Sequence, residues 1–167
     1  MKFLLNFIQR AVATVGFTGY LPFMPGTFGS AVMVAALWYA NRRYDFSFSG
    51  QFWIYYWVVA VVLIMVSIVF SSRSQELYGS PDSSHIVIDE CAGQFITFLF
   101  VPFSLMTLAL GFVLFRLFDV VKPFPVNKME EIEGGVGVTA DDVAAGVMAN
   151  ISLLLIMAAY HFLRGRM

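Results

Sequence analysis

The chain contains three short groups of charged residues whose types and spacing are suited to chemistry. The first is the adjacent pair Asp89 and Glu90, which stands between the apolar triplet 86–88 and a long apolar run. A carboxylate beside apolar sequence of membrane length is costly unless a cation, a metal or a substrate offsets its desolvation. The pair therefore indicates a carboxylate cluster that binds a divalent metal.

The second group is Arg116, Asp119 and Lys122. On a helix, Arg116 and Asp119 are neighbours three residues apart, and Pro123 ends the helix directly after Lys122. An arginine pairs with phosphate in a bidentate way and a lysine acts as a point charge, so this group favours a phosphate ligand. The alternative is that Arg116 and Asp119 form only a buried ion pair.

The third group is a glycine-rich stretch, residues 134–142, which is predicted to be a loop that opens the last helix and ends in Asp141 and Asp142. Structural alternatives exist for the acids. Thr139 and Asp142 have the spacing of a capping box, and Asp89 and Glu90 in a first helical turn would oppose the helix dipole favourably.

Carboxylates without cysteine ligands favour Mg²⁺ or Mn²⁺ over zinc or copper. The chain has one cysteine and two histidines, which excludes a cysteine zinc site and a histidine-rich metal site. A bound metal can supply a hydroxide and shield a phosphoryl group. The predicted metal ligands are Asp82, Asp89, Glu90, Asp141 and Asp142. The predicted catalytic residues are Asp89, Glu90, Arg116, Asp119, Lys122 and Asp142.

Residues 16–30 are rich in glycine and proline and are predicted not to form a continuous helix. One interpretation is a buried loop that offers backbone N–H groups and the side chains of Thr27 and Ser30 to an anion. Gly26, Thr27, Arg116 and Lys122 are then the predicted substrate-binding residues. The alternative is a simple turn in which Thr27 or Ser30 is a helix N-cap.

The composition is that of a membrane protein. Of 167 residues, 59% are apolar and only 13% are charged, against about 25% charged in soluble domains. The length predicts one domain, residues 1–167, and a net charge of −1 gives no reason to expect a nucleic-acid partner. All acids except Asp45 fall at residues 76–90, at Asp119 or at residues 130–142, whereas a solvated surface would scatter them.

These patterns predict an all-α, polytopic membrane bundle of about four to five membrane segments. The expected segments are 27–40, 52–70, a hairpin over 86–118 broken near Pro102, and 143–163. Residues 1–15 predict an amphipathic interfacial helix. A signal peptide and a helix packed on the core are the alternatives.

With the N-terminus inside, the polar loops 16–27, 71–90 and 119–142 all lie on one side of the bilayer. That side carries six of the ten lysines and arginines, so a weak positive-inside bias predicts that it is cytoplasmic. The acidic groups, distant in sequence, are thereby expected to meet at one membrane face.

Four blocks of sequence resemble the phosphatidylglycerophosphatase A family of bacterial membrane phosphatases. They are LPFMPGTFGS at 21–30, the IVIDE-x-x-G stretch at 86–93, FRLFDVVKPFPV at 115–126 and GGVGVTADDVAAGV at 134–147. They keep the family's order and cover the chain nearly end to end.

The resemblance implies an all-helical fold and Mg²⁺-dependent hydrolysis of phosphatidylglycerophosphate to phosphatidylglycerol and phosphate. It implies a site in the cytoplasmic leaflet of the bacterial inner membrane. By motif it carries over Thr27, Asp82, Asp89, Glu90, Arg116, Asp119, Lys122, Asp141 and Asp142. His85 departs from the family pattern, and its residue type fits either an acid/base or an interfacial side chain.

Two other functions fit the same residues. A divalent-cation carrier needs carboxylates at mid-membrane depth, whereas the candidates here lie at predicted helix ends on one side. A non-catalytic lipid-binding membrane protein is the other. Within the enzyme interpretation, water or an aspartate is the nucleophile, and no oligomeric state is predicted.

Overall fold

The computed structural model describes residues 2–44, 53–80 and 83–165. Over these residues the chain is entirely helical, as predicted, with eight α-helices, one short 3-10 helix and no strand. In chain order the helices are α1 (Lys2–Ala13), the 3-10 helix η1 (Thr18–Tyr20), α2 (Pro25–Tyr44), α3 (Trp53–Ser71), α4 (Ser74–Tyr78), α5 (Ile88–Ile96), α6 (Leu105–Val121), α7 (Val126–Glu130) and α8 (Gly135–Arg164).

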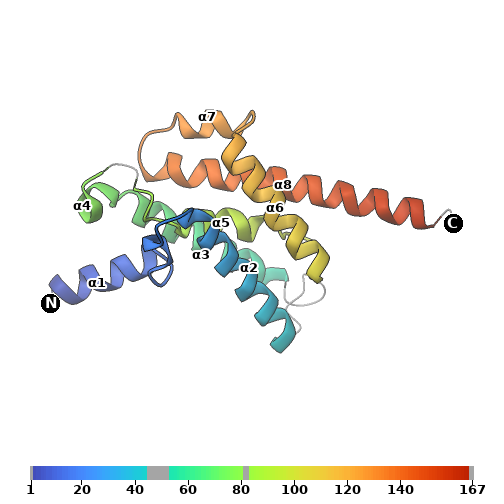
Figure 1. Ribbon diagram of the computed structural model, residues 1–167, viewed down its shortest axis with the longest axis horizontal. Coiled ribbons are helices and arrows are strands. Elements are labelled where there is room, and N and C mark those ends of the chain that lie inside the picture. The colour runs from blue at the N-terminus through green and yellow to red at the C-terminus, as the bar shows by residue number, and fades with distance from the viewer. Residues whose placement is uncertain (1, 45–52, 81–82, 166–167) are drawn as a thin grey trace.

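Helix α5 lies at the centre of the fold, and α2, α3 and α8 pack against it (Figure 1). All of its residues except Glu90 are buried. The predicted break in segment 86–118 is present, because residues 97–104 separate α5 from α6. The first arm of that hairpin is not the expected membrane crossing, since nine residues of helix span only about 13 Å.

Aromatic and aliphatic side chains fill the space around the C-terminal end of α5. Phe98 and Leu153 are completely buried there, and the ring of Tyr56 stacks on that of Phe95. The hydroxyl of Tyr56 donates a hydrogen bond of 2.8 Å to the carbonyl oxygen of Phe95. This packing fixes α5 between α3 and α8 and so fixes the direction of its acidic N-terminus.

Two glycines let α5 and α8 cross with their backbones in contact. A Cβ on Gly146 would meet the carbonyl of Gly93, and a Cβ on Gly93 would meet the carbonyl of Asp142. Ala145 and Ala149 of α8 also face the core, since both residues are fully buried. The crossing brings Asp142 next to the N-terminal half of α5.

Helix α8 begins at Gly135, eight residues before the predicted start of the last span. The prediction of a glycine-rich loop over 134–142 is therefore wrong, and so is the capping box. Thr139 lies inside the helix and shares a hydrogen bond of 2.7 Å with Ser67 of α3. Glycine is needed at Gly135 and Gly137 for another reason, because their Cα atoms touch Ser72 and Ile132.

Helix α2 begins at Pro25, at the position where a missing N–H costs nothing. Residues 16–24 are non-helical apart from η1, as predicted, but Gly26, Thr27 and Ser30 belong to the helix. Neither Thr27 nor Ser30 is an N-cap, and the predicted anion-binding loop is instead the first turns of α2. The hydroxyl of Ser30 donates to the carbonyl of Gly26 at 2.9 Å.

Two of the described helices are long and apolar enough to cross a membrane. They are residues Ile54–Ser71 of α3 and the whole of α8, and only 22% and 28% of their most apolar windows are buried inside the protein. Helix α1 also forms where predicted, and its residues Leu4 and Phe7 are about half exposed. The alternative in which its apolar side chains pack on the core is therefore excluded for these two residues.

Candidate active site

Three carboxylates converge at one end of the helical bundle. One oxygen from each of Asp89, Glu90 and Asp142 lies within 4.8 Å of the other two. Asp89 and Asp142 are buried and Glu90 is partly buried. We call these three residues the acidic cluster. The structure thus brings together acids separated by about fifty residues of chain.

Two helices position the acidic cluster. Asp89 and Glu90 lie in the first turn of α5, where Asp89 Oδ1 accepts a hydrogen bond of 3.0 Å from the Glu90 N–H. This position agrees with the predicted favourable placement against the helix dipole. Asp142 lies in the third turn of α8. The contact of its backbone with Gly93 fixes the position of Asp142 along the axis of α5.

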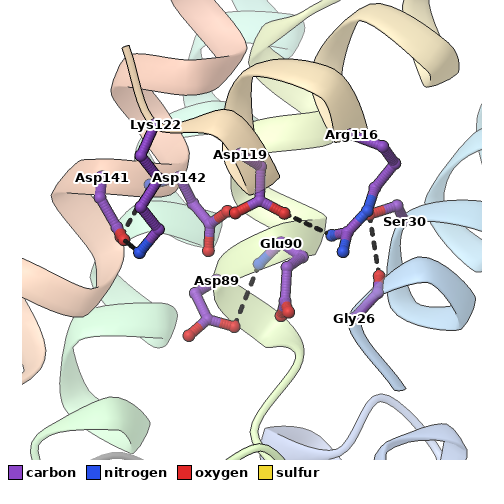
Figure 2. Close-up of polar contacts among 9 residues, drawn as sticks. All are labelled: Gly26, Ser30, Asp89, Glu90, Arg116, Asp119, Lys122, Asp141 and Asp142. Carbon is purple, nitrogen blue, oxygen red and sulfur yellow. Dashed lines mark hydrogen bonds and ion pairs between the residues drawn. The ribbon is translucent and has the colours of Figure 1, made fainter. Parts of the chain in front are cut away.

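Two cations flank the acidic cluster, one on either side (Figure 2). Arg116 forms an ion pair of 2.6 Å with Asp119, as the structural alternative predicted, and both side chains are largely shielded from solvent. Figure 2 shows the Asp119 carboxylate beside that of Asp142. The ion pair is therefore part of the wall of the site rather than remote from it.

Lys122 ends α6 as predicted and adopts a left-handed conformation with φ of 47°. Its ammonium group donates 2.8 Å hydrogen bonds to Asp141 Oδ2 and Glu130 Oε1. Burial would lower the pKa of Lys122, but the hydrogen bonds to the two carboxylates outweigh it and raise the pKa well above its usual value. The lysine therefore stays charged beside the acidic cluster.

Asp141 lies beside the acidic cluster and is not one of its three members. Its Oδ2 accepts from Lys122, and its Oδ1 accepts a 2.9 Å hydrogen bond from the Asp142 N–H. Both oxygens are thus engaged within the protein. In this arrangement Asp141 holds Lys122, and its role as a metal ligand stays a prediction.

The N-terminus of α2 closes the site on the side of Arg116. The Cα of Gly26 packs directly on the Glu90 carboxylate, and a Cβ there would meet Glu90 Oε1 and lie 3.2 Å from Arg116 Nη1. The Thr27 hydroxyl is buried and has no hydrogen-bond partner among the described residues. Only glycine at position 26 leaves the carboxylate in place.

Burial dominates the electrostatics of the two acids on α5. It raises the pKa of Asp89 to about 6, although hydrogen bonds from Glu90 oppose the shift. Burial also raises the pKa of Glu90 well above its usual value, and the nearby charge of Asp89 adds to the shift. Without a cation between them, these carboxylates are poorly accommodated as charged groups.

The acidic cluster fits a divalent cation. Glu90 Oε2 and Asp142 Oδ1 are buried and have no hydrogen-bond partner in the described part of the chain. A hard cation would satisfy these oxygens and offset the repulsion among three carboxylates. Mg²⁺ prefers oxygen ligands of this kind, with water and phosphate oxygens completing its coordination.

A cavity of about 580 Å³ opens in front of the acidic cluster. Its polar lining includes Asp119, Lys122 and Asp141 in addition to the three clustered acids. Sequence reasoning missed four further polar residues in the wall, Ser83, Ser84, Glu130 and Glu133. Glu130 is exposed, but its hydrogen bond to Lys122 makes it part of the site. No sequence pattern distinguishes it from its exposed neighbour Glu131.

Two predicted candidates remain, Asp82 and His85. Asp82, a predicted metal ligand, lies outside the described residues. His85 is held by a 3.0 Å hydrogen bond between Nδ1 and the Gly19 carbonyl, and its ring packs between those of Tyr20 and Tyr78. It does not line the cavity, which supports a packing role.

Carboxylates and a lysine line one cavity of this helical protein, and an arginine pairs with one of those carboxylates. These are groups that phosphate-ester hydrolysis uses. The profile of the family Phosphatidylglycerophosphatase A matches residues 11–157. The chain therefore belongs to the phosphatidylglycerophosphatase A family and is a phosphatase.

Individual relatives agree with this class. A protein of Escherichia coli named Phosphatidylglycerophosphatase A is 33% identical over 81% of this chain and 76% of its own length. One of the same name from Haemophilus influenzae is 40% identical over 47% of this chain and 49% of its own length. A Bacteroides thetaiotaomicron protein with the provisional name phosphatidylinositol-3-phosphatase is 36% identical over 87% and 91% of the two chains. No solved structure matches the chain.

Proposed function

We propose that this protein is a Mg²⁺-dependent phosphatase that hydrolyses the phosphomonoester of phosphatidylglycerophosphate, giving phosphatidylglycerol and phosphate. The convergence of Asp89, Glu90 and Asp142 between Arg116 and Lys122 is the observation that carries the proposal. Family membership supports a lipid phosphate as the substrate. It also favours catalysis over the cation carrier and the non-catalytic lipid binder.

In this proposal the acidic cluster holds Mg²⁺, which when bound supplies charge neutralisation and activation of a water for attack on phosphorus. The phosphomonoester enters the cavity with its oxygens toward the two cations. Lys122, kept charged by Asp141 and Glu130, neutralises one oxygen at the cavity wall. Arg116, oriented by Asp119, offers its guanidinium to another as charge grows in the transition state.

We infer that the protein is a multi-pass protein of the bacterial inner membrane, with α2, α3, α6 and α8 as its four membrane segments. Helix α5, too short to cross, is enclosed by them. Helix α1 lies in the interface with residues such as Leu5 and Ile8 in the lipid. The site residues come from the N-terminal ends of α2, α5 and α8 and the C-terminal end of α6, all at one end of the bundle. The bias of lysine and arginine toward that side supports a cytoplasmic active site.

Phosphate release by the purified protein in mixed micelles tests the proposal. Phosphatidylglycerophosphate, phosphatidylinositol 3-phosphate and phosphatidic acid are compared, each with Mg²⁺ and after chelation. The expected result is release from phosphatidylglycerophosphate that exceeds release from the other two lipids, stops on chelation and returns with Mg²⁺. Preferential release from phosphatidylinositol 3-phosphate would contradict the substrate, and release that persists after chelation would contradict the metal.

A further inference from the structure

A second, apolar groove lies between α2 and α6. Its volume is about 390 Å³, and the described residues that line it are all apolar: Ala31, Val34, Ala35, Trp38, Leu105, Leu108, Ala109 and Phe112. Three alanines keep it open where larger side chains would close the space between the helices. It is separate from the polar cavity, with which it shares no lining residue.

The groove leads directly away from the acidic cluster. On α2, Thr27, Ala31, Ala35 and Trp38 recur at helical spacing, so the groove face continues into the turn that contacts Glu90. On α6, Leu105, Ala109, Phe112 and Arg116 recur in the same way, so that groove face ends at the arginine. The two helices run in opposite directions along the groove (Figure 1).

The length of the groove suits one leaflet of a bilayer. From Thr27 to Trp38, and from Leu105 to Arg116, the helices rise about 17 Å. Half of a hydrocarbon core of about 30 Å is a similar distance. The far end is bounded by Trp38, over whose ring the Arg42 guanidinium lies at 5.5 Å.

We propose that this groove seats one acyl chain of the phospholipid whose headgroup phosphate occupies the acidic site. The inference rests on the proposed function and adds the part of the substrate that the polar cavity does not recognise. The glycerol backbone of the lipid lies at the end of the groove that the two helix faces extend toward Thr27 and Arg116. The Thr27 hydroxyl at this end is buried and has no hydrogen-bond partner among the described residues.

Filling the groove tests the inference. Ala35→Phe and Ala109→Phe place a ring in it, while Ala36→Phe adds the same ring to an exposed neighbour on α2 that does not line it. Each variant is assayed with dioleoyl and with dibutanoyl phosphatidylglycerophosphate. We expect the groove variants to lose kcat/KM for the dioleoyl lipid by at least about tenfold, equivalent to roughly two unburied methylenes. Turnover of the dibutanoyl lipid and both activities of Ala36→Phe should stay near wild type.

Equal losses on long and short lipids, or groove variants that match Ala36→Phe, would overturn the inference. If the wild-type protein releases no phosphate from either lipid, the proposed function fails, and photolabelling still decides on the groove. A phosphatidylglycerophosphate with a diazirine in one acyl chain should label α2 and α6 in the wild type but not in Ala35→Phe. Excess unlabelled phosphatidylglycerophosphate should suppress this labelling. Equal suppression by phosphatidylcholine would mean that the groove holds bulk lipid and would contradict the inference. Crosslinks to a second copy of the chain would contradict it as well.

Discussion

Gly26 of α2 and Glu90 of α5 are in direct contact, with the glycine Cα against the carboxylate. A side chain at position 26 would have to displace Glu90 or Arg116, both of which belong to the proposed site. We therefore expect Gly26→Ala to reduce kcat/KM by about 100-fold, the typical cost of a displacement of about 1 Å in an active site. Gly165→Ala is the matched control, because a Cβ there meets its nearest neighbour at an ordinary 3.4 Å. Full activity of Gly26→Ala would mean that Glu90 is not held in place by this contact.

Removing one carboxylate from the acidic cluster should abolish metal-dependent activity while leaving the fold intact. We expect Asp89→Asn and Asp142→Asn each to lower phosphate release by at least about 100-fold, because the remaining ligands bind the metal too weakly. Glu131→Gln is the control, since Glu131 is exposed and its ion-pair partner among the described residues is Lys128 at the surface. Circular dichroism and elution volume verify the fold, and a folded Asp89→Asn protein with normal turnover would contradict its assigned role.

The charge of Lys122 should matter where that of Lys128 does not. Lys122 bridges Asp141 and Glu130 at the cavity wall, whereas Lys128 pairs with Glu131 outside it. We expect Lys122→Gln to lower kcat/KM by roughly 100-fold through loss of charge stabilisation in the transition state. Lys128→Gln should remain within about twofold of wild type, as surface pairs contribute little. Similar rates for the two variants would remove Lys122 from the mechanism.

The packing of Gly146 against Gly93 should hold the two halves of the acidic cluster together. A Cβ at Gly146 meets the Gly93 carbonyl, which is backbone and cannot move aside alone. We expect Gly146→Ala to destabilise the protein by about 1–3 kcal/mol, the usual cost of overpacking, and to weaken Mg²⁺ binding. Thermal unfolding with and without Mg²⁺, compared with Gly165→Ala, measures both effects. An unchanged Tm would show that the helices separate there without cost.

The raised pKa of Asp89, about 6 against an ordinary 3.8, predicts a pH dependence for the metal-free protein. A folded-state pKa above the unfolded one gives stability that is present below the unfolded value and is lost as pH rises through the folded value. In the presence of chelator, we therefore expect Tm to fall between about pH 4 and pH 6, the interval between the two pKa values. Asp89→Asn, which cannot titrate, should show a smaller fall. A Tm that rises over this interval by the same amount in both proteins would contradict the shift.

Sequence reasoning predicted most of the helical segments because their apolar runs are long and bounded by polar residues. The break between α5 and α6 and the end of α6 at Lys122 were predicted correctly from Pro102 and Pro123. The start of α8 was not, because Gly135 and Gly137 resemble loop residues when their packing partners are unknown. Those partners, Ser72 and Ile132, are tertiary contacts that no local pattern contains.

The sequence predicted which residues form the site better than it predicted how their side chains are arranged. Asp89, Glu90 and Asp142 stand out because charges in an apolar chain are expensive, and the structure brings them together. The sequence also predicted their neighbour Asp141 as a metal ligand. Its pairing with Lys122 depends on the point along α8 at which that helix crosses α6. The role of Glu130 depends on α7, a five-residue helix with no periodic signal of its own.

Binding of Mn²⁺, a paramagnetic substitute for Mg²⁺, is the measurement that tests the central claim most directly. Electron paramagnetic resonance of the purified protein, titrated with Mn²⁺, reports the bound ion without requiring turnover. The account predicts at least one site per chain that Mg²⁺ displaces and that Asp142→Asn loses, while Glu131→Gln retains it. Mn²⁺ binding by Asp142→Asn with wild-type affinity would contradict the claim that Asp89, Glu90 and Asp142 share one ion.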